Sequence, residues 1–318
     1  MKTFYWLVKR EFWENRGSFL FAPVICGGVV LLLTLMGVIA GEVFRSRAGV
    51  HVSGMDFAQL RSHLDAGDLD KFSMALDITM LVPSMLIGLV LFFVVFFYCT
   101  NTLADERRDR SILFWKSLPI SDRATVLSKV VSAVVVAPVI ATLAGIAAGL
   151  ALLVLLAIAA SFHGVNLWEM LWSLPHPLRI TAHLLSNLPL YVVWSLPTVG
   201  WLMLCSAWAR SKQFLWALAL PIGSGILVGW FGLMDLFHRG TLWYWKNIVG
   251  RLLLSVFPGG WMPDHALGMA MGGADASRMF VSLTDYSLLL TPPFLIGAVA
   301  GIVMIAGAIW LRRWRVDG

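Results

Sequence analysis

One short stretch of the chain combines charged, apolar and helix-ending residues in close succession. Asp105 opens a run of six consecutive charged residues that ends at Arg110, and residues 112–115 are apolar. Glu106 and Arg110 stand at helical i,i+4 spacing, so we expect a solvated, internally paired turn. An apolar patch on a water-facing loop needs cover from lipid or from a partner protein. The stretch is therefore a candidate contact site.

A sharp corner follows this apolar patch. Pro119 ends the first helix because it lacks an N–H and because it restricts the backbone of Leu118. Ser121 is predicted to cap a second helix, with Asp122 in its first turn, where a negative charge suits the helix dipole. Residues 102–129 are thus predicted to form a helix, a corner and a second helix.

Motifs for catalysis and nucleotide binding are absent from the sequence. It contains no phosphate-binding loop of the G-x-x-x-x-G-K-[ST] kind, no HExxH and no CxxC. We therefore expect no enzyme activity, no cofactor and no metal site in this chain. His265 lies near Met262 and Met269, whose soft sulfurs suit copper, so external metal binding or pH sensing stays open as an alternative to gap filling.

Composition indicates the setting of these residues. The 318 residues are 59% hydrophobic and 13% charged, whereas a soluble domain is about 45–50% apolar and about 25% charged. Too little charge is available to coat a water-facing surface, which indicates a membrane protein. The net charge of +6, from 24 basic and 18 acidic residues, is spread too thinly for a nucleic-acid-binding domain.

Six charge-free runs are long enough to cross a bilayer core about 30 Å thick. The first is expected to be a retained anchor rather than a cleaved signal, because it is long and follows the acidic Glu11 and Glu14. The fold class predicted is an all-α integral membrane domain that covers residues 1–318. Its spans are residues 19–40, 78–101, 130–160, 184–209, 214–233 and 288–311.

Two further helices are predicted outside the spans. Residues 1–18 gather Phe4, Leu7 and Phe12 on one side, which is typical of an amphipathic helix on the membrane surface, although a simple flank of the first span is the alternative. Residues 247–260 are apolar but too short to span, which favours a re-entrant or interfacial helix before the last span.

The third span raises a question of length and packing. If residues 122–160 are all helical, they reach about twice the thickness of the bilayer core, so the helix must protrude, tilt or bend at Pro138. Gly145 and Gly149 have the spacing of a close helix contact.

The distribution of basic residues indicates the orientation of the spans. About 15 of them lie within about 60 residues on one face, whereas the other face carries about 9 in about 115 residues, so both termini are predicted to be cytoplasmic. Tyr98 falls near a span end and is expected in the aromatic belt at the membrane surface.

The outer segment holds a second candidate site. Arg251 interrupts an otherwise apolar run, and a buried charge needs a partner or water, for which Asp235 is a candidate. Arg251, Pro258 and Gly259 are therefore predicted to line an outer gate. The alternative is that Arg251 extends to the lipid headgroups.

The order of elements resembles the membrane subunit of a bacterial ABC transporter of the ABC-2 type, similar to type V exporters. The resemblance is carried by an amphipathic first helix, six spans, a broken outer helix and the stretch between the second and third spans. Its most specific residues are Asp105, Glu106, Arg107, Arg108, Ser111, Leu113, Phe114, Ser117, Leu118, Pro119, Ser121 and Lys129.

The resemblance implies a mechanism and a set of partners. In that family the corner is a coupling helix that seats in a groove of a separate ATPase, and two ATPases assemble with two permease subunits, which are identical or homologous. ATP and Mg²⁺ would bind the ATPases, and the chain would lie in the bacterial inner (cytoplasmic) membrane, among lipid and away from nucleic acid. The coupling residues would be Glu106, Arg107, Leu113, Phe114, Ser117, Leu118, Pro119, Ser121 and Asp122.

Two functions are consistent with this resemblance. The first is export of an amphiphile, such as a peptide, a drug-like molecule, a lipid or a polysaccharide. The second is a membrane scaffold or sensor that signals to or from the same ATPase without transport.

The predicted topology has a direct test in intact cells. Cysteines placed at Ser53 and Ser277 should react with a membrane-impermeant thiol reagent, while a cysteine at Ser121 should not. The reverse labelling pattern would overturn the orientation.

Overall fold

The computed structural model describes residues 2–48, 66–109, 120–162, 176–234, 241–261 and 285–314, and within them it is all-helical. Among these residues, six helices are long and apolar enough to cross a membrane, as the sequence predicts. The main helices are α1 (Lys2–Glu14), α2 (Ala22–Ala48), α4 (Ala66–Arg108), α6 (Asp122–Val131), α7 (Ala137–Ser161), α9 (His176–Ser186), α10 (Leu188–Trp208), α11 (Gln213–Leu233) and α16 (Pro292–Trp314).

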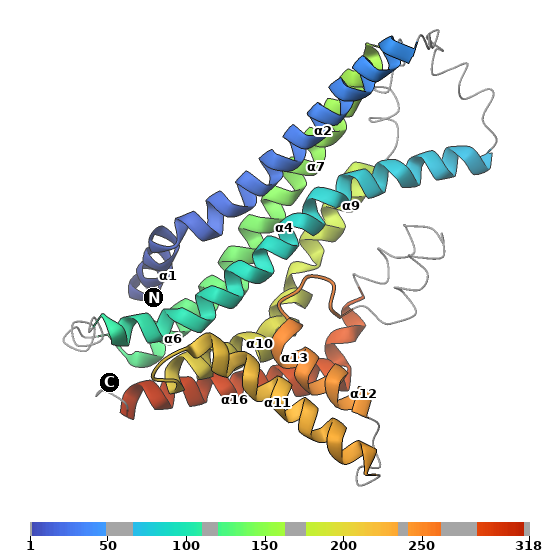
Figure 1. Cartoon of the computed structure of the whole chain (residues 1–318). Helices are drawn as coiled ribbons and strands as arrows, with labels where there is room; N and C mark the ends of the chain where they lie inside the picture. Colours follow the sequence, from blue (N-terminus) through green and yellow to red (C-terminus); the bar gives the residue numbers. More distant parts are fainter. Residues whose placement is uncertain are drawn as a thin grey trace.

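The helices form two arms that diverge from one end of the molecule (Figure 1). One arm contains α2, α4 and α7, and the other contains α10, α11 and α16, with α4 packed against α10 as well as against α7. Both ends of the described chain lie at the shared end, next to α1 and α6 (Figure 1). We call this the joined end.

Several helices have different bounds from the predicted spans. The span predicted at 78–101 lies within the much longer α4, and the run at 184–209 is divided between the end of α9 and α10, which meet at Asn187. The last span begins at Pro292 rather than 288, after a short 3₁₀ turn, Tyr286–Leu290. Charge-free runs mark the lipid-facing core of a helix, whereas these helices continue into polar sequence at their ends.

The third span is one helix of 40 residues, Asp122–Ser161. A π-helical turn, Ser132–Val136, joins α6 to α7. It ends just before Pro138, which has no N–H to donate and whose ring would clash with a carbonyl of the preceding turn. The predicted irregularity at Pro138 is therefore a π-turn, and the helix extends well beyond a bilayer core.

Small residues bring the helix backbones together. A Cβ added at Gly145 would lie 2.8 Å from Ser84 Oγ, and one at Gly149 would lie 2.6 Å from the carbonyl oxygen of Met80. The close contact predicted for these two glycines is confirmed, and its partner is α4. Helices in lipid gain little from apolar burial against one another, so such close packing is a main source of their association.

The segment before the last span, predicted at residues 247–260, is helical but begins earlier than predicted. Helix α12 (Thr241–Tyr244), a π-turn (Trp245–Val249) and α13 (Gly250–Leu254) follow one another, rather than a helix that starts at 247. A turn comes next, in which Gly260 N–H donates to the Phe257 carbonyl at 3.2 Å and Gly259 has φ 83°. Proline followed by a left-handed glycine is typical of a type II turn.

The contact between α4 and α7 can be tested at Gly149. Gly149→Val should push the two helices apart and lower the thermal unfolding temperature in detergent by several degrees, because the added methyl groups meet backbone atoms. Gly37→Val on α2 is the matched control, since a Cβ there meets nothing within 4 Å. Equal unfolding temperatures for the two variants would contradict the packing described.

Candidate functional site

The two flanks of the predicted contact loop meet at the joined end. Leu113, Phe114, Ser117, Leu118 and Pro119 lie outside the described residues. The flank on the N-terminal side is the end of α4, which carries Glu106 and Arg107, and the flank on the C-terminal side is the start of α6, which carries Ser121 and Asp122.

Ser121 caps α6 as predicted. Its hydroxyl accepts a hydrogen bond from the N–H of Ala124 at 3.2 Å, and Asp122 lies in the first turn. Asp122 also accepts from Nε of Arg312 at 3.2 Å. The start of α6 is thereby joined to the end of α16.

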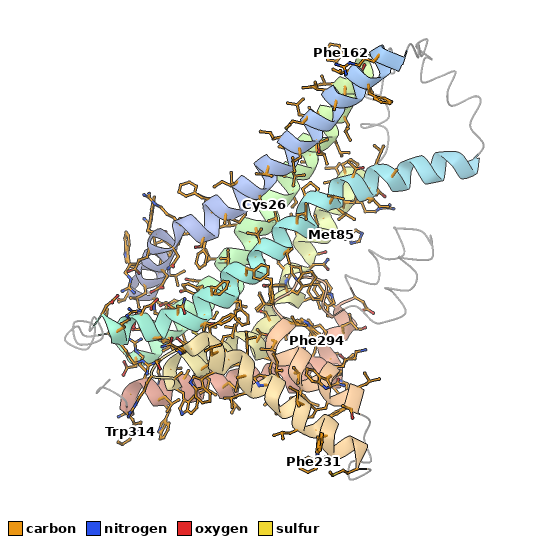
Figure 2. The ribbon with its side chains drawn as sticks, in the orientation of Figure 1. Cys26, Met85, Phe162, Phe231, Phe294 and Trp314 are labelled. Carbon is orange, nitrogen blue, oxygen red and sulfur yellow. The ribbon has the colours of Figure 1, made fainter. Side chains whose placement is uncertain are left out.

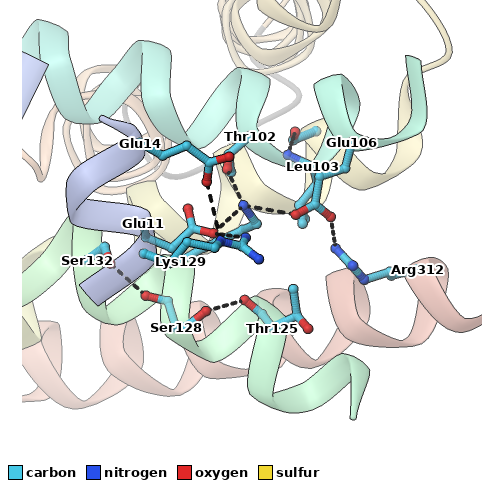
Figure 3. Close-up of polar contacts among 12 residues, drawn as sticks. Glu11, Glu14, Thr102, Leu103, Glu106, Thr125, Ser128, Lys129, Ser132 and Arg312 are labelled. Atoms are coloured by element: carbon cyan, nitrogen blue, oxygen red, sulfur yellow. Dashed lines mark hydrogen bonds and ion pairs between the residues drawn. The ribbon is translucent and has the colours of Figure 1, made fainter. Parts of the chain in front are cut away.

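Glu106 pairs with residues of other helices. The sequence predicts a solvated side chain at this position, but the structure buries it. One carboxylate oxygen lies 3.1 Å from Lys129 Nζ on α6, and the other pairs with Arg312 on α16 (Figure 3). Its side chain is buried, although the neighbouring Asp105 is exposed. Arg110, its predicted partner, lies outside the described residues.

Glu11 of α1 completes the cluster. Its carboxylate lies 2.9 Å from Lys129 Nζ and 2.6 Å from the guanidinium of Arg10, and it accepts a hydrogen bond from the Tyr98 hydroxyl at 2.9 Å. Thr102 also accepts from Lys129 Nζ, at 2.9 Å. Lys129 and Glu11 are only 3% and 1% exposed, so neither charge is solvated.

The pKa of Glu11 depends on two opposing effects, burial and the neighbouring charges. Burial alone would raise it, but the charges of Lys129 and Arg10 and the hydrogen bonds from Lys129 and Tyr98 lower it below its usual range. The ionised carboxylate therefore stabilises the packing of α1 above its ordinary pKa, and this contribution is lost as the pH falls through the lowered value.

Arg107 joins the end of α4 to the end of α10. Its guanidinium donates to the carbonyl oxygen of Ser206 and to that of Ala209, the latter at 2.9 Å. In return, the Ser206 hydroxyl accepts from the N–H groups of Leu103 and Ala104. Orphan carbonyls at the end of α10 are thus satisfied by a side chain of another helix.

The arrangement links α1, α4, α6 and α16 through ion pairs. We call it the charge cluster: Arg10, Glu11, Glu106, Asp122, Lys129 and Arg312. Within these six residues three carboxylates face three cations, and the exposed Glu14 also pairs with Arg10, at 3.4 Å. Across the described part of the chain, no group of three or more His, Cys, Asp or Glu residues is placed to hold a metal ion.

At the opposite end of the second arm, Arg251 points into the protein. Its guanidinium carbon lies 3.4 Å from the centroid of the Trp194 ring, and Nη2 donates to the Pro293 carbonyl at 3.0 Å. A Cβ at Gly297 would collide with the same guanidinium. Burial lowers the pKa of Arg251 to about 10, which still leaves it charged at neutral pH.

The other predicted gate residues lie beside this site. Thr198 of α10 donates to the carbonyl oxygen of Arg251 and accepts from the N–H of Ser255, at 2.9 and 3.0 Å, so it fixes the end of α13. Pro258 and Gly259 form the turn that follows and line a cavity against α4 and α10. Asp235 lies outside the described residues.

The sequence points to Glu106, Asp122 and Lys129 as candidate residues but not to their pairing with one another. It does not identify Arg10, Glu11 or Arg312 as members of the charge cluster. Tyr98 does not lie in an aromatic belt at the membrane surface. It is buried, and its hydroxyl donates a hydrogen bond to Glu11. A signal for Glu11 was present, since it follows Phe4 and Leu7 at helical spacing on the apolar side of α1. No comparable signal marked Arg312, which lies in an ordinary basic flank.

Comparisons with known proteins give no relative for this chain. No family model, no curated protein and no solved structure matches it.

Breaking the charge cluster at its centre should be costly. Lys129→Met leaves Glu11 and Glu106 buried without their shared cation, and the loss of one partner of a buried pair typically costs about 3–5 kcal/mol. We expect a clear fall in the unfolding temperature in detergent. Arg123→Met is the control on the same helix, because Arg123 is exposed. A fall of the same size in both variants would argue against the cluster.

Proposed function

We propose that the chain is the membrane subunit of an ABC transporter of the ABC-2 type, and that it exports an amphiphile. ATP would be hydrolysed, with Mg²⁺, on two copies of a separate ATPase. A second permease subunit, identical or homologous, would complete the pathway. The chain would lie in the bacterial inner membrane with the joined end in the cytoplasm.

The observation that supports this proposal most strongly is the position of the charge cluster. Residues 110–119 connect α4 to α6, and the ends of both helices carry members of the cluster. A partner that pushes on this loop would move α4 and α6 together with α1 and α16, because separating them would leave buried charges unpaired. That is the mechanical property that a coupling element requires.

The long third span supports the same proposal. It runs without a break from Asp122 at the joined end to Ser161, at the far end of the arm that contains α2 and α7 (Figure 1). Motion that enters at the joined end would therefore be delivered along the whole membrane thickness.

Span α2 presents an apolar surface, with Ile25, Leu33 and Met36 exposed, which suits contact with lipid or with the second subunit.

Partner capture tests the coupling assignment. The tagged chain, purified in mild detergent, should bring down an ATPase that mass spectrometry identifies, while Phe114→Asp and Leu118→Asp should lose it because each places a charge in an apolar contact. Trp314→Asp is the control, since Trp314 is exposed at the end of α16 (Figure 2). Equal recovery with parent and loop variants would reject the assignment.

The outer gate has a separate test in the assembled complex. Arg251→Ala should alter ATP turnover in reconstituted bilayers without lowering the yield of complex, because the guanidinium links α13 to α10 and α16. Lys246→Ala on the same segment is the control. Unchanged turnover and transport with normal assembly would remove the support for a gate. ATP turnover without transport of any amphiphile would favour the alternative function, a membrane scaffold or sensor coupled to the ATPase.

A further inference from the structure

A cavity lies inside the protein between the two arms. Its volume is about 270 Å³, and its walls come from α4, α7, the junction of α9 with α10, and the turn that contains Pro258 and Gly259. An engineered cavity of about 150 Å³ is already large enough to bind benzene. The space therefore accommodates a substantial apolar group.

Three polar atoms line this cavity without any hydrogen-bond partner. They are Ser84 Oγ, Asn187 Oδ1 and the hydroxyl of Tyr191, and each is buried. Tyr191 is only 4% exposed. Buried polar groups are nearly always paired, and leaving them unpaired is costly. Three such atoms around one cavity indicate a site that is completed by something else.

The geometry of α10 places two of these atoms together. Asn187 precedes the first turn of α10, where its side chain makes no capping hydrogen bond, and Tyr191 follows four residues later on the same face. Ser84 faces them from α4, beside Pro83 in the helix. Polar groups from both sides thus converge on a cavity whose other lining residues are apolar except for Thr142 on α7.

The lining defines the chemistry of the occupant. Among the described residues, none that lines the cavity carries a charge, and most are Leu, Ile, Met, Pro, Gly or aromatic. A charged headgroup would lose its hydration without gaining a counter-ion. Asn187 Oδ1 can only accept, so the occupant must donate to it, whereas the two hydroxyls can donate or accept.

An opening toward the outside of the protein is available. Met85 of α4 and Phe257 line the cavity and are also well exposed, at 58% and 42%. Met85 lies midway along α4 (Figure 2), in the stretch Ala75–Arg108 that is apolar enough to cross a membrane. A molecule dissolved in the bilayer could enter there without crossing water.

We propose that this cavity binds an uncharged amphiphile, with its hydroxyl or amide group held by Asn187, Tyr191 and Ser84 and its apolar part against α4 and α7. The site stands on the cavity alone and does not depend on an ATPase partner. In a transporter it would favour neutral lipids and neutral drug-like molecules over anionic ones.

Photolabelling of the full chain in lipid nanodiscs tests the proposal. The probe is a long-chain alcohol with a diazirine close to its hydroxyl group, and its labelled peptides are mapped by mass spectrometry. We expect saturable labelling of α4 and α10 peptides that unlabelled alcohol displaces. The matching alkane and the matching carboxylate should label these peptides weakly.

Two variants isolate the hydrogen bonds. Tyr191→Phe with Asn187→Leu should lower labelling about tenfold, the loss expected for two hydrogen bonds, while its unfolding temperature stays near that of the parent because both groups are unpaired. Tyr244→Phe is the control, since that hydroxyl bonds to Ser224 outside the cavity. Unchanged labelling in the double variant would overturn the proposal, and so would equal labelling by the alkane or the carboxylate.

The same preparation shows whether the amphiphile comes from the membrane or from outside it. A neutral lipid that remains bound to the freshly purified parent and is lost from the double variant would identify the membrane as its source. Saturable labelling without a retained lipid would indicate a molecule supplied from outside. If the parent shows no saturable labelling, water alone completes the site and the proposal fails.

Discussion

The joined end of the molecule depends on one requirement: charges that leave water must be paired. Lys129 is buried between two carboxylates, and each carboxylate belongs to a different helix. Arg312 extends the same chain of ion pairs to Asp122. Since no member can move without exposing another to an apolar surrounding, α1, α4, α6 and α16 are fixed relative to one another. Such a cluster selects one arrangement more than it adds stability.

The remainder of the molecule is held by weaker and more adjustable contacts. Glycines let α7 approach α4, and Gly200 and Gly301 do the same for α10 and α16, where a Cβ on Gly200 would lie 2.6 Å from a backbone oxygen. Away from the joined end the two arms diverge and leave a cavity with unpaired polar groups. A rigid end and two separable arms suit a protein that converts a push at one face into movement at the other, which is what we propose for it.

The sequence predicts the parts of this structure that follow from local rules. Long apolar runs predict the six membrane-spanning helices. The position of Ser121 before Asp122 predicts a helix cap, and the spacing of Gly145 and Gly149 predicts a close helix contact. The sequence does not predict which charges pair, because Glu11, Lys129 and Arg312 are far apart in the chain. Tyr98 differs from its predicted place in the aromatic belt for the same reason, because its partner Glu11 lies on α1. The unpaired atoms of the cavity depend on tertiary packing and have no local signature.

The most direct test of the charge cluster is a double-mutant cycle between Glu106 and Arg312, measured as unfolding free energy in mixed micelles. Glu106→Gln and Arg312→Gln should each destabilise the protein, and the double variant should lose less than the sum of the two. A coupling energy of about 1 kcal/mol or more would be typical of residues in one buried network. Effects that add within about 0.3–0.5 kcal/mol would mean that the two residues act independently, which would contradict a shared ion-pair network at the joined end.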